Sequence, residues 1–250
     1  MLRAVSSSGG VRAVSRGVAT GTGGEMLTQA RKTLGRIKRV LRLISRIVRA
    51  DYLERTKWQA RRLQLKREWE NGGRVGPPPH AVKESAIRSA SLAHGIRTLV
   101  ETGTLHGDMV AAVALDFDHI YSIELSRELY WLARLRFLGR RGVHLVQGDS
   151  SDKLSSVLEQ INRPCVFWLD GHYGGGHMAR GKKDVPIVEE LSAILAHPVH
   201  EHVVVIDDVG IFERAEGDTP SLAELEDLIR SRRPASEFVV EDNMIRVTLA

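Results

Sequence analysis

The chain has 250 residues, of which 42% are hydrophobic, 27% charged and 5% aromatic, and its formal net charge is +5. This composition is ordinary for a globular domain and excludes collagen-like, disulfide-dense and wholly disordered chains. Cys165 is the only cysteine, which excludes a disulfide within the chain and a zinc or iron–sulfur site built on several cysteines. No run of about 18 apolar residues occurs, so the sequence predicts no membrane-spanning helix.

The charge is distributed unevenly along the chain. Residues 1–70 contain 17 Lys and Arg against five Asp and Glu, a net charge of +12, whereas residues 71–250 contain 19 against 26, a net charge of −7. The sequence therefore combines a basic N-terminal arm with an acidic body. A basic arm favours a polyanionic partner, either membrane headgroups or nucleic acid.

Residues 1–24 contain no acidic residue and are rich in Ser, Gly and Arg. Such a segment buries too little apolar surface to offset the entropy of ordering it, so we expect disorder. Its composition is also typical of a mitochondrial transit peptide. We favour a flexible start of a cytoplasmic protein and keep the mitochondrial segment as the alternative.

Residues 25–70 have the spacing of a basic amphipathic helix. Apolar residues recur three or four positions apart from Leu34 to Val48, and Lys and Arg fill many of the other positions. This pattern is typical of a helix that lies on an anionic membrane, here through residues 31–67, or that packs on a partner, including a second copy of the chain. A helix that covers its own domain has equal weight. Nucleic acid is the weaker alternative, because few aromatic residues here could stack on bases.

From residue 81 to residue 250, short β-rich runs alternate with segments of helical spacing. This order predicts an α/β fold, a doubly wound parallel sheet with helices on both faces, preceded by a Gly/Pro linker over residues 71–80. Two facing runs near the end, separated by Glu241-Asp242-Asn243, predict an antiparallel hairpin. The expected strands are 97–102, 119–124, 143–147, 165–169, 202–206, 237–240 and 244–249, and the expected helices are 81–94, 108–115, 127–138, 152–161, 186–195 and 221–229.

The residues at the carboxyl ends of the expected strands are the first candidates for a site, because ligands of such sheets bind there, near the point where the strand order reverses. Gly103 and Gly107 follow the first strand and permit a tight turn and a close approach of the backbone to a ligand. Glu124 ends the second strand, where an acid can bind both hydroxyls of a ribose or favour the start of the next helix. Asp149 follows the third strand, as a contact for an adenine amino group or as a helix N-cap.

Three carboxylates, those of Asp170, Asp207 and Asp208, follow the fourth and fifth strands. Like charges at the mouths of neighbouring strands are costly without a counterion, and a hard divalent cation such as Mg²⁺ prefers carboxylate oxygens. We therefore predict a metal site formed by these three residues. The alternative is that one of them caps a helix while another points to solvent.

Together these motifs resemble those of the class I S-adenosyl-L-methionine-dependent methyltransferases. The resemblance covers about residues 80–250 and rests on VETGTLHGD, IYSIELS, VQGDSS, FWLDGHY and VVVIDDV in this order. It implies a Rossmann-like, seven-stranded sheet with a reversed last strand. It also implies that the cofactor is held by the glycine-rich first motif and by acids after the next three strands, which here are Glu101, Gly103, Thr104, Gly107, Glu124, Asp149 and Asp170.

Asp170 with Asp207 and Asp208 resembles the metal-dependent O-methyltransferases of catechol and macrocin type, which implies a Mg²⁺ ion that binds the hydroxyl of the methyl acceptor. The glycine-rich segment DGHYGGG departs from the catechol enzymes, so their substrates are not carried over. We expect an enzyme that methylates a small-molecule or glycan hydroxyl. Asp170 and His172 are the expected catalytic residues, with His172 as general base or, alternatively, only a histidine of a surface loop.

Three other functions are consistent with parts of the sequence. A nicotinamide-dependent oxidoreductase has a similar sheet, but the second glycine of G-x-G-x-x-G is missing and the C-terminal hairpin argues against it. A nucleic-acid methyltransferase would use the basic arm as an electrostatic contact, yet DGHY stands where the amino-methylating enzymes have an N-P-P-Y-like tetrapeptide. A membrane-associated binding module without catalytic activity is the third.

Overall fold

The computed structural model describes residues 61–172 and 181–250. The predictions for residues 1–24 and for the helix over residues 25–60 lie outside the described residues, as does most of the predicted membrane contact. Residues 61–71 are helical, in agreement with the C-terminal part of the predicted helix. Contacts between residues divide the chain between positions 59 and 60, so that this helical segment belongs to the same unit as the sheet.

One seven-stranded sheet organises residues 80–250, with the strand order β3-β2-β1-β4-β5-β7-β6. Strands β1 to β5 are parallel, and β7 runs antiparallel to both β5 and β6. The predicted doubly wound sheet and its antiparallel hairpin are therefore confirmed. The strands are β1 (Thr98–Thr102), β2 (His119–Glu124), β3 (Val143–Gln147), β4 (Val166–Leu169), β5 (Val203–Asp207), β6 (Glu237–Glu241) and β7 (Met244–Thr248).

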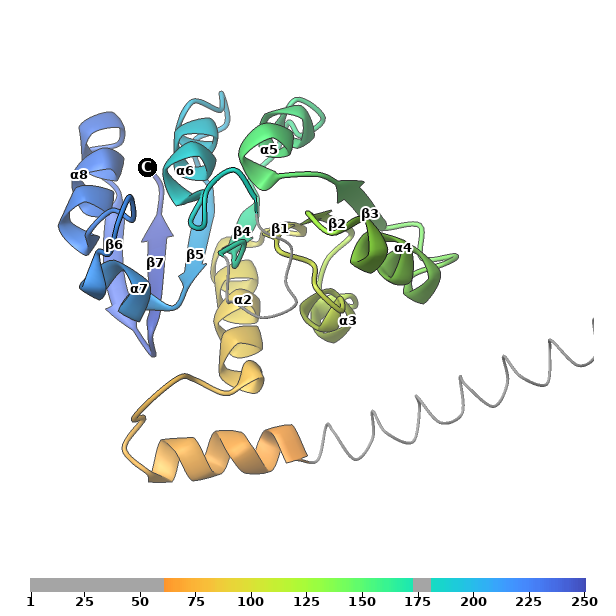
Figure 1. Cartoon of the computed structure of the whole chain (residues 1–250), viewed down its shortest axis with the longest axis horizontal. Coiled ribbons are helices and arrows are strands. Elements are labelled where there is room, and N and C mark those ends of the chain that lie inside the picture. The colour runs from red at the N-terminus through yellow and green to blue at the C-terminus, as the bar shows by residue number, and fades with distance from the viewer. Residues whose placement is uncertain (1–60, 173–180) are drawn as a thin grey trace, which may run out of the picture. The chain divides into compact units, whose positions relative to one another are not determined.

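Helices cover both faces of the sheet (Figure 1). On one face lie α2 (His80–His94), α3 (Asp108–Val113) and α4 (Arg127–Arg136), and on the other α5 (Ser150–Leu158), α6 (Ile187–Leu195) and α8 (Leu222–Arg232). A short helix that the periodicity did not predict, α7 (Val209–Arg214), follows β5 directly. Its six residues are too few to show a helical repeat.

The central strands are buried on both faces, as their apolar runs predict. In β4, Val166 and Trp168 pack with the helices α2 to α4, whereas Phe167 and Leu169 pack with α5 to α8. The side chains of Phe167 and Trp168 are no more than 1% exposed. Two apolar cores, one on each face, therefore fix the sheet and hold the ends of its strands in place.

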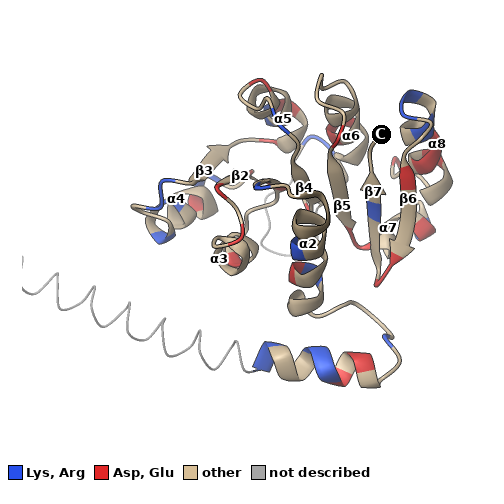
Figure 2. Ribbon diagram, turned by 180° about the vertical axis from the view of Figure 1, so that it is seen from behind, with Lys and Arg blue, Asp and Glu red and all other residues tan. Residues whose placement is uncertain are grey.

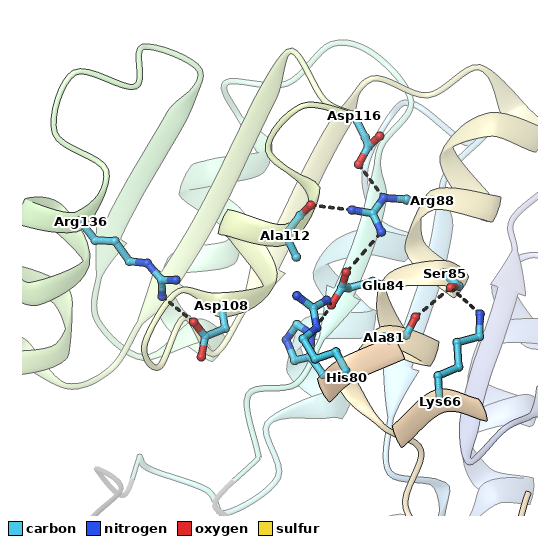
Figure 3. A network of polar contacts seen from close by, with 11 residues as sticks. Lys66, His80, Ala81, Glu84, Ser85, Arg88, Asp108, Ala112, Asp116 and Arg136 are labelled. Carbon is cyan, nitrogen blue, oxygen red and sulfur yellow. Dashed lines mark hydrogen bonds and ion pairs between the residues drawn. The ribbon is translucent and has the colours of Figure 1, made fainter. Parts of the chain in front are cut away.

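A polar network joins α2 to the helical residues 61–71 (Figure 3). Glu84 is only 5% exposed, and its carboxylate pairs with Arg62, with His80 Nδ1 at 2.5 Å and with Arg88 Nη1 at 3.3 Å. Lys66 Nζ donates to Ser85 Oγ over 3.1 Å. These contacts hold α2 from its outer side, while its inner side faces the sheet.

Candidate functional site

A cavity of about 200 Å³ opens at the carboxyl end of the sheet, where the chain order reverses between β1 and β4. This is the position at which open α/β sheets bind ligands. The volume is below the roughly 300–1,000 Å³ of small-molecule sites, so a bound nucleoside would extend beyond it. The lining residues are Gly103, Leu105, Ile123, Glu124, Leu125, Leu129, Gly148, Asp149, Ser150, Asp170, Gly171, His172, Gly181, Lys183 and Pro186.

Gly103 directly follows β1 and lies in the wall of the cavity, where the chain turns a corner. Its φ is +85°, and a Cβ atom there would lie 2.5 Å from the carbonyl oxygen of Asp170. Both the backbone conformation and the close approach of the chain after β4 therefore require glycine. Gly107 differs, because a Cβ there would lie 2.6 Å from the ring of Phe137, so this glycine allows α3 to pack against the end of α4 rather than facing the cavity.

Glu124 is held in the cavity wall by two backbone amides. Leu105 N and Ser126 N each donate to its carboxylate over 2.7 Å, and the side chain is largely buried. Burial raises the pKa of this carboxyl, although the two amide hydrogen bonds oppose the rise. The amides orient the carboxylate at the end of β2, and its contact with Ser126, the N-cap of α4, supports the start of that helix.

Asp149 is the N-cap of α5, so that this helix begins at Ser150 rather than at the predicted residue 152. Its carboxylate accepts from Ser151 N and, across the cavity mouth, from Lys182 N, both over 3.0 Å. Burial raises the pKa of Asp149, but these hydrogen bonds outweigh it and hold the value below the usual range. A Cβ at position 181 would lie 2.7 Å from this carboxylate, so Gly181 permits the contact.

Glu101 and Thr104 lie behind the wall and are not among the residues that line the cavity. Ser122 Oγ donates to the carboxylate of Glu101 and lies 2.5 Å from Thr104 Oγ1. All three side chains are buried, and burial raises the pKa of Glu101 to about 8. This chain of hydrogen bonds fixes the end of β1 to β2 and thereby supports the glycine corner.

The three predicted metal ligands stand together at the ends of β4 and β5. Burial raises the pKa of Asp170 well above its usual range, and the neighbouring Asp207 and Asp208 raise it further. His172 Nδ1 lies 3.5 Å from Asp170 Oδ1. Burial lowers the pKa of His172, which favours the neutral imidazole.

Lys83 of α2 enters this carboxylate cluster, and no pattern in the sequence predicted this. Its ammonium group pairs with Asp207 Oδ2 and lies 5.9 Å from the ring centroid of Trp168. The other carboxylate oxygen of Asp207 is buried and has no hydrogen-bond partner in the described part of the chain. No local pattern marks Lys83, because only the packing of α2 across the sheet brings it to β5.

Asn243, in the turn of the C-terminal hairpin, is a second residue that the sequence analysis missed. Its Nδ2 donates to Asp208 Oδ1 over 3.3 Å, and its backbone carbonyl accepts from Val209 N over 3.0 Å. Asp208 has a φ of +55° at the N-terminus of α7. The hairpin turn thus holds Asp208 in an uncommon backbone conformation beside the other two carboxylates.

The donor set suits a hard cation, since it consists of three carboxylates, one with an unpaired buried oxygen. As the side chains stand, no group of three or more His, Cys, Asp and Glu within residues 61–172 and 181–250 is arranged to hold a metal ion. The carboxylates therefore fit a divalent cation in chemistry only, and the charge that the structure places against Asp207 is the ammonium group of Lys83.

Comparisons with solved structures identify the fold. The O-methyltransferase TomG from Streptomyces achromogenes, solved in complex with SAM, matches with a TM-score of 0.51 and 15% identity over 75% of this chain and 88% of TomG. An O-methyltransferase from Bacillus cereus in complex with SAH matches with a TM-score of 0.48 and 13% identity over 75% of this chain and 89% of that one. No protein-family model and no curated protein matches the sequence. On the likeness to TomG and the strand order, the chain has the fold of the class I S-adenosylmethionine-dependent methyltransferases.

Proposed function

We propose that the protein transfers the methyl group of S-adenosylmethionine to a hydroxyl of a small molecule or a glycan. The observation that carries this proposal is the cavity at the reversal of strand order, with the Gly103 corner on one side and the oriented carboxylate of Glu124 on the other. In this assignment Glu124 accepts hydrogen bonds from the ribose hydroxyls, and Asp149 lies near the adenine. Gly103 gives the amino-acid part of the cofactor access to the backbone.

The transfer is an in-line displacement at the methyl carbon. The acceptor oxygen forms the new C–O bond while the C–S bond breaks, the bonding electron pair stays on sulfur, and the hydroxyl proton must leave. His172 takes this proton on a ring nitrogen, because the neutral imidazole is favoured at the cavity edge and Asp170 lies at its Nδ1. The protein's part is to hold oxygen, methyl carbon and sulfur in line.

Asp170, Asp207 and Asp208 are the residues that would hold a Mg²⁺ ion in this assignment. When bound, such an ion lowers the pKa of the acceptor hydroxyl and orients it. Lys83 supplies one positive charge to the same cluster, and Asn243 keeps Asp208 in position.

Labelled S-adenosylmethionine with a panel of sugar, phenol and polyketide hydroxyl acceptors tests the activity. We expect a labelled product whose formation falls at least about 100-fold in the His172→Ala variant, the usual contribution of a general base. A chelator and the Asp208→Asn variant test the metal. Unchanged turnover in both would reject the metal and leave the methyl transfer standing, whereas no labelled product from any acceptor would contradict the proposed activity.

A further inference from the structure

Helix α4 turns large apolar side chains toward solvent. Trp131, Leu132, Leu135 and Leu138 are 54%, 59%, 70% and 82% exposed, and we call these four residues the α4 outer face. Trp131 and Leu135 are four positions apart and lie on one side of the helix. Leu138 follows in the turn after the helix ends at Arg136. Ala133 and Phe137, on the opposite side, are buried in the core. The helix is thus apolar on both sides, and among the described residues only its inner side is covered.

The α4 outer face belongs to a firmly held helix. Ser126 caps the N-terminus of α4, and the ring of Phe137 packs closely against Gly107 at the other end. Arg136, on the inner side, pairs with Asp108 of α3 at 2.7 Å. Trp131, Leu132 and Leu135 therefore lie on a helix that is held at both ends, and Leu138 lies in the turn directly after it.

Four arginines accompany the α4 outer face in the sequence, two on α4 and two in the loop that follows it. Arg127, Arg134, Arg140 and Arg141 are exposed, and within residues 61–172 and 181–250 none of them forms an ion pair. Glu128 is the one acidic residue of α4. Figure 2 shows the basic residues on α4 and on the loop between α4 and β3. Apolar side chains close in sequence to arginines that form no ion pair in the described part of the chain are complementary to a surface that is apolar inside and anionic at its boundary.

We propose that the α4 outer face docks on the surface of an anionic lipid bilayer. The leucines and the body of Trp131 would enter the boundary between headgroups and acyl chains, where Trp is favoured because one end of its ring can remain hydrated. The four arginines would meet the lipid phosphates, because an anionic membrane surface attracts basic side chains that lie close to it. A second copy of the chain is the poorer occupant, because a two-fold contact would bring two sets of arginines together.

This inference goes beyond the proposed function and does not depend on it. The surface consists of described residues only and does not include the basic segment before residue 61. None of the helices that the structure describes has the length and hydropathy needed to cross a bilayer, so the contact we infer is with the membrane surface.

Flotation of the full chain with vesicles tests the proposal. We expect binding to phosphatidylcholine vesicles that contain phosphatidylglycerol, and weaker binding to pure phosphatidylcholine. The triple variant Trp131→Gln, Leu135→Gln, Leu138→Gln should bind the anionic vesicles at least about tenfold more weakly, because it removes the apolar side chains that would be buried. The matched control is Leu92→Gln with Leu115→Gln, which removes two leucines that are 82% and 87% exposed elsewhere and should bind like the wild type.

Quenching of tryptophan fluorescence by brominated lipids locates the contact, since other segments could also bring the chain to a vesicle. The Trp131→Phe variant keeps an apolar ring, so we expect it to bind while losing the quenched component of the wild type. Equal vesicle binding by the triple variant and the wild type, or equal quenching with and without Trp131, would overturn the proposal. A wild-type dimer that the triple variant loses, without vesicle binding, would overturn it in favour of a protein interface.

Discussion

At the scale of single residues, Gly103 gives a sharp prediction because a second glycine serves as its control. Gly103 and Gly139 have similar backbone angles, with φ of +85° and +83°, but a Cβ at Gly139 meets nothing within 4 Å. Gly139→Ala should lower the free energy of unfolding by about 1 kcal/mol, because an alanine is strained in the left-handed conformation. Gly103→Ala should lower the free energy of unfolding clearly more than Gly139→Ala does, since its Cβ would also collide with the Asp170 carbonyl. Urea unfolding of the two variants checks this, and equal costs would show that the close contact is not important.

Glu101 makes stability depend on pH in a direction that its environment fixes. Burial raises its pKa from 4.5 to about 8 in the folded protein, so between these values the folded state keeps a proton that the unfolded state loses. Stability should therefore fall as pH rises through this window, by up to about 1.4 kcal/mol per pH unit. Glu101→Gln, which is neutral throughout, should flatten the dependence, whereas Glu128→Gln on the exposed side of α4 should not. Urea unfolding across the window measures this, and an unchanged slope in Glu101→Gln would count against the assignment.

The sequence predicted residues of the cavity wall where a single strand end positions them. Gly103, Glu124, Asp149, Asp170 and His172 all line the cavity, because each follows directly from a strand whose register is set by its own apolar pattern. Lys83 and Asn243 were not predicted, because they contact Asp207 and Asp208 from separate elements of the fold. Their roles depend on packing between distant segments, which no local spacing encodes.

At the scale of elements, the Lys83–Asp207 pair couples α2 to β5. The side chain of Asp207 is 4% exposed and that of Lys83 22%. Lys83→Met should therefore lower the free energy of unfolding by about 2–3 kcal/mol. This is less than the roughly 3–5 kcal/mol lost when a fully buried ion pair is broken, because Lys83 is partly exposed. The double variant Lys83→Met, Asp207→Asn should recover much of this, because position 207 then carries no buried charge that lacks its cation. Denaturant unfolding of both variants measures the coupling, and a single variant as stable as the wild type would show that the pair contributes nothing.

Glu84 couples α2 to the helical residues 61–71 in the same way. Glu84→Ala would leave the cations of Arg62 and Arg88 without their shared buried carboxylate, and we expect a loss of about 2–4 kcal/mol, allowing for the partial exposure of Arg88. Glu68→Ala is the matched control, since the exposed side chain of Glu68 accepts only a hydrogen bond from Gln64 among the described residues. Thermal unfolding of the two variants compares them, and similar melting temperatures would contradict the role of Glu84.

The elements themselves were largely predictable. The strands observed agree with the expected ones to within one residue at either end, because short apolar runs between turn residues leave little choice of boundary. The helix ends were less predictable, since caps decide them: α5 starts at the Asp149 cap, and α4 ends at Arg136, before Gly139. The helix α7 was missed for lack of a repeat.

At the scale of the whole molecule, the strand order explains why separate parts of the sequence meet in one site. The reversal between β1 and β4 leaves the cavity at the carboxyl edge, and the antiparallel insertion of β7 beside β5 carries the hairpin turn to the same edge. The hairpin was predictable from its turn residues, but its place beside β5 and its contact with Asp208 were not. Such pairings are set by the closing of the whole sheet.

Equilibrium binding of the demethylated cofactor S-adenosylhomocysteine tests the central claim, that the cavity beside Gly103 and Glu124 is a methyl-donor site. Titration calorimetry of the wild-type chain should show one molecule bound per chain, with NAD unable to displace it. No heat of binding for S-adenosylhomocysteine or S-adenosylmethionine, or a preference for NAD, would contradict the account.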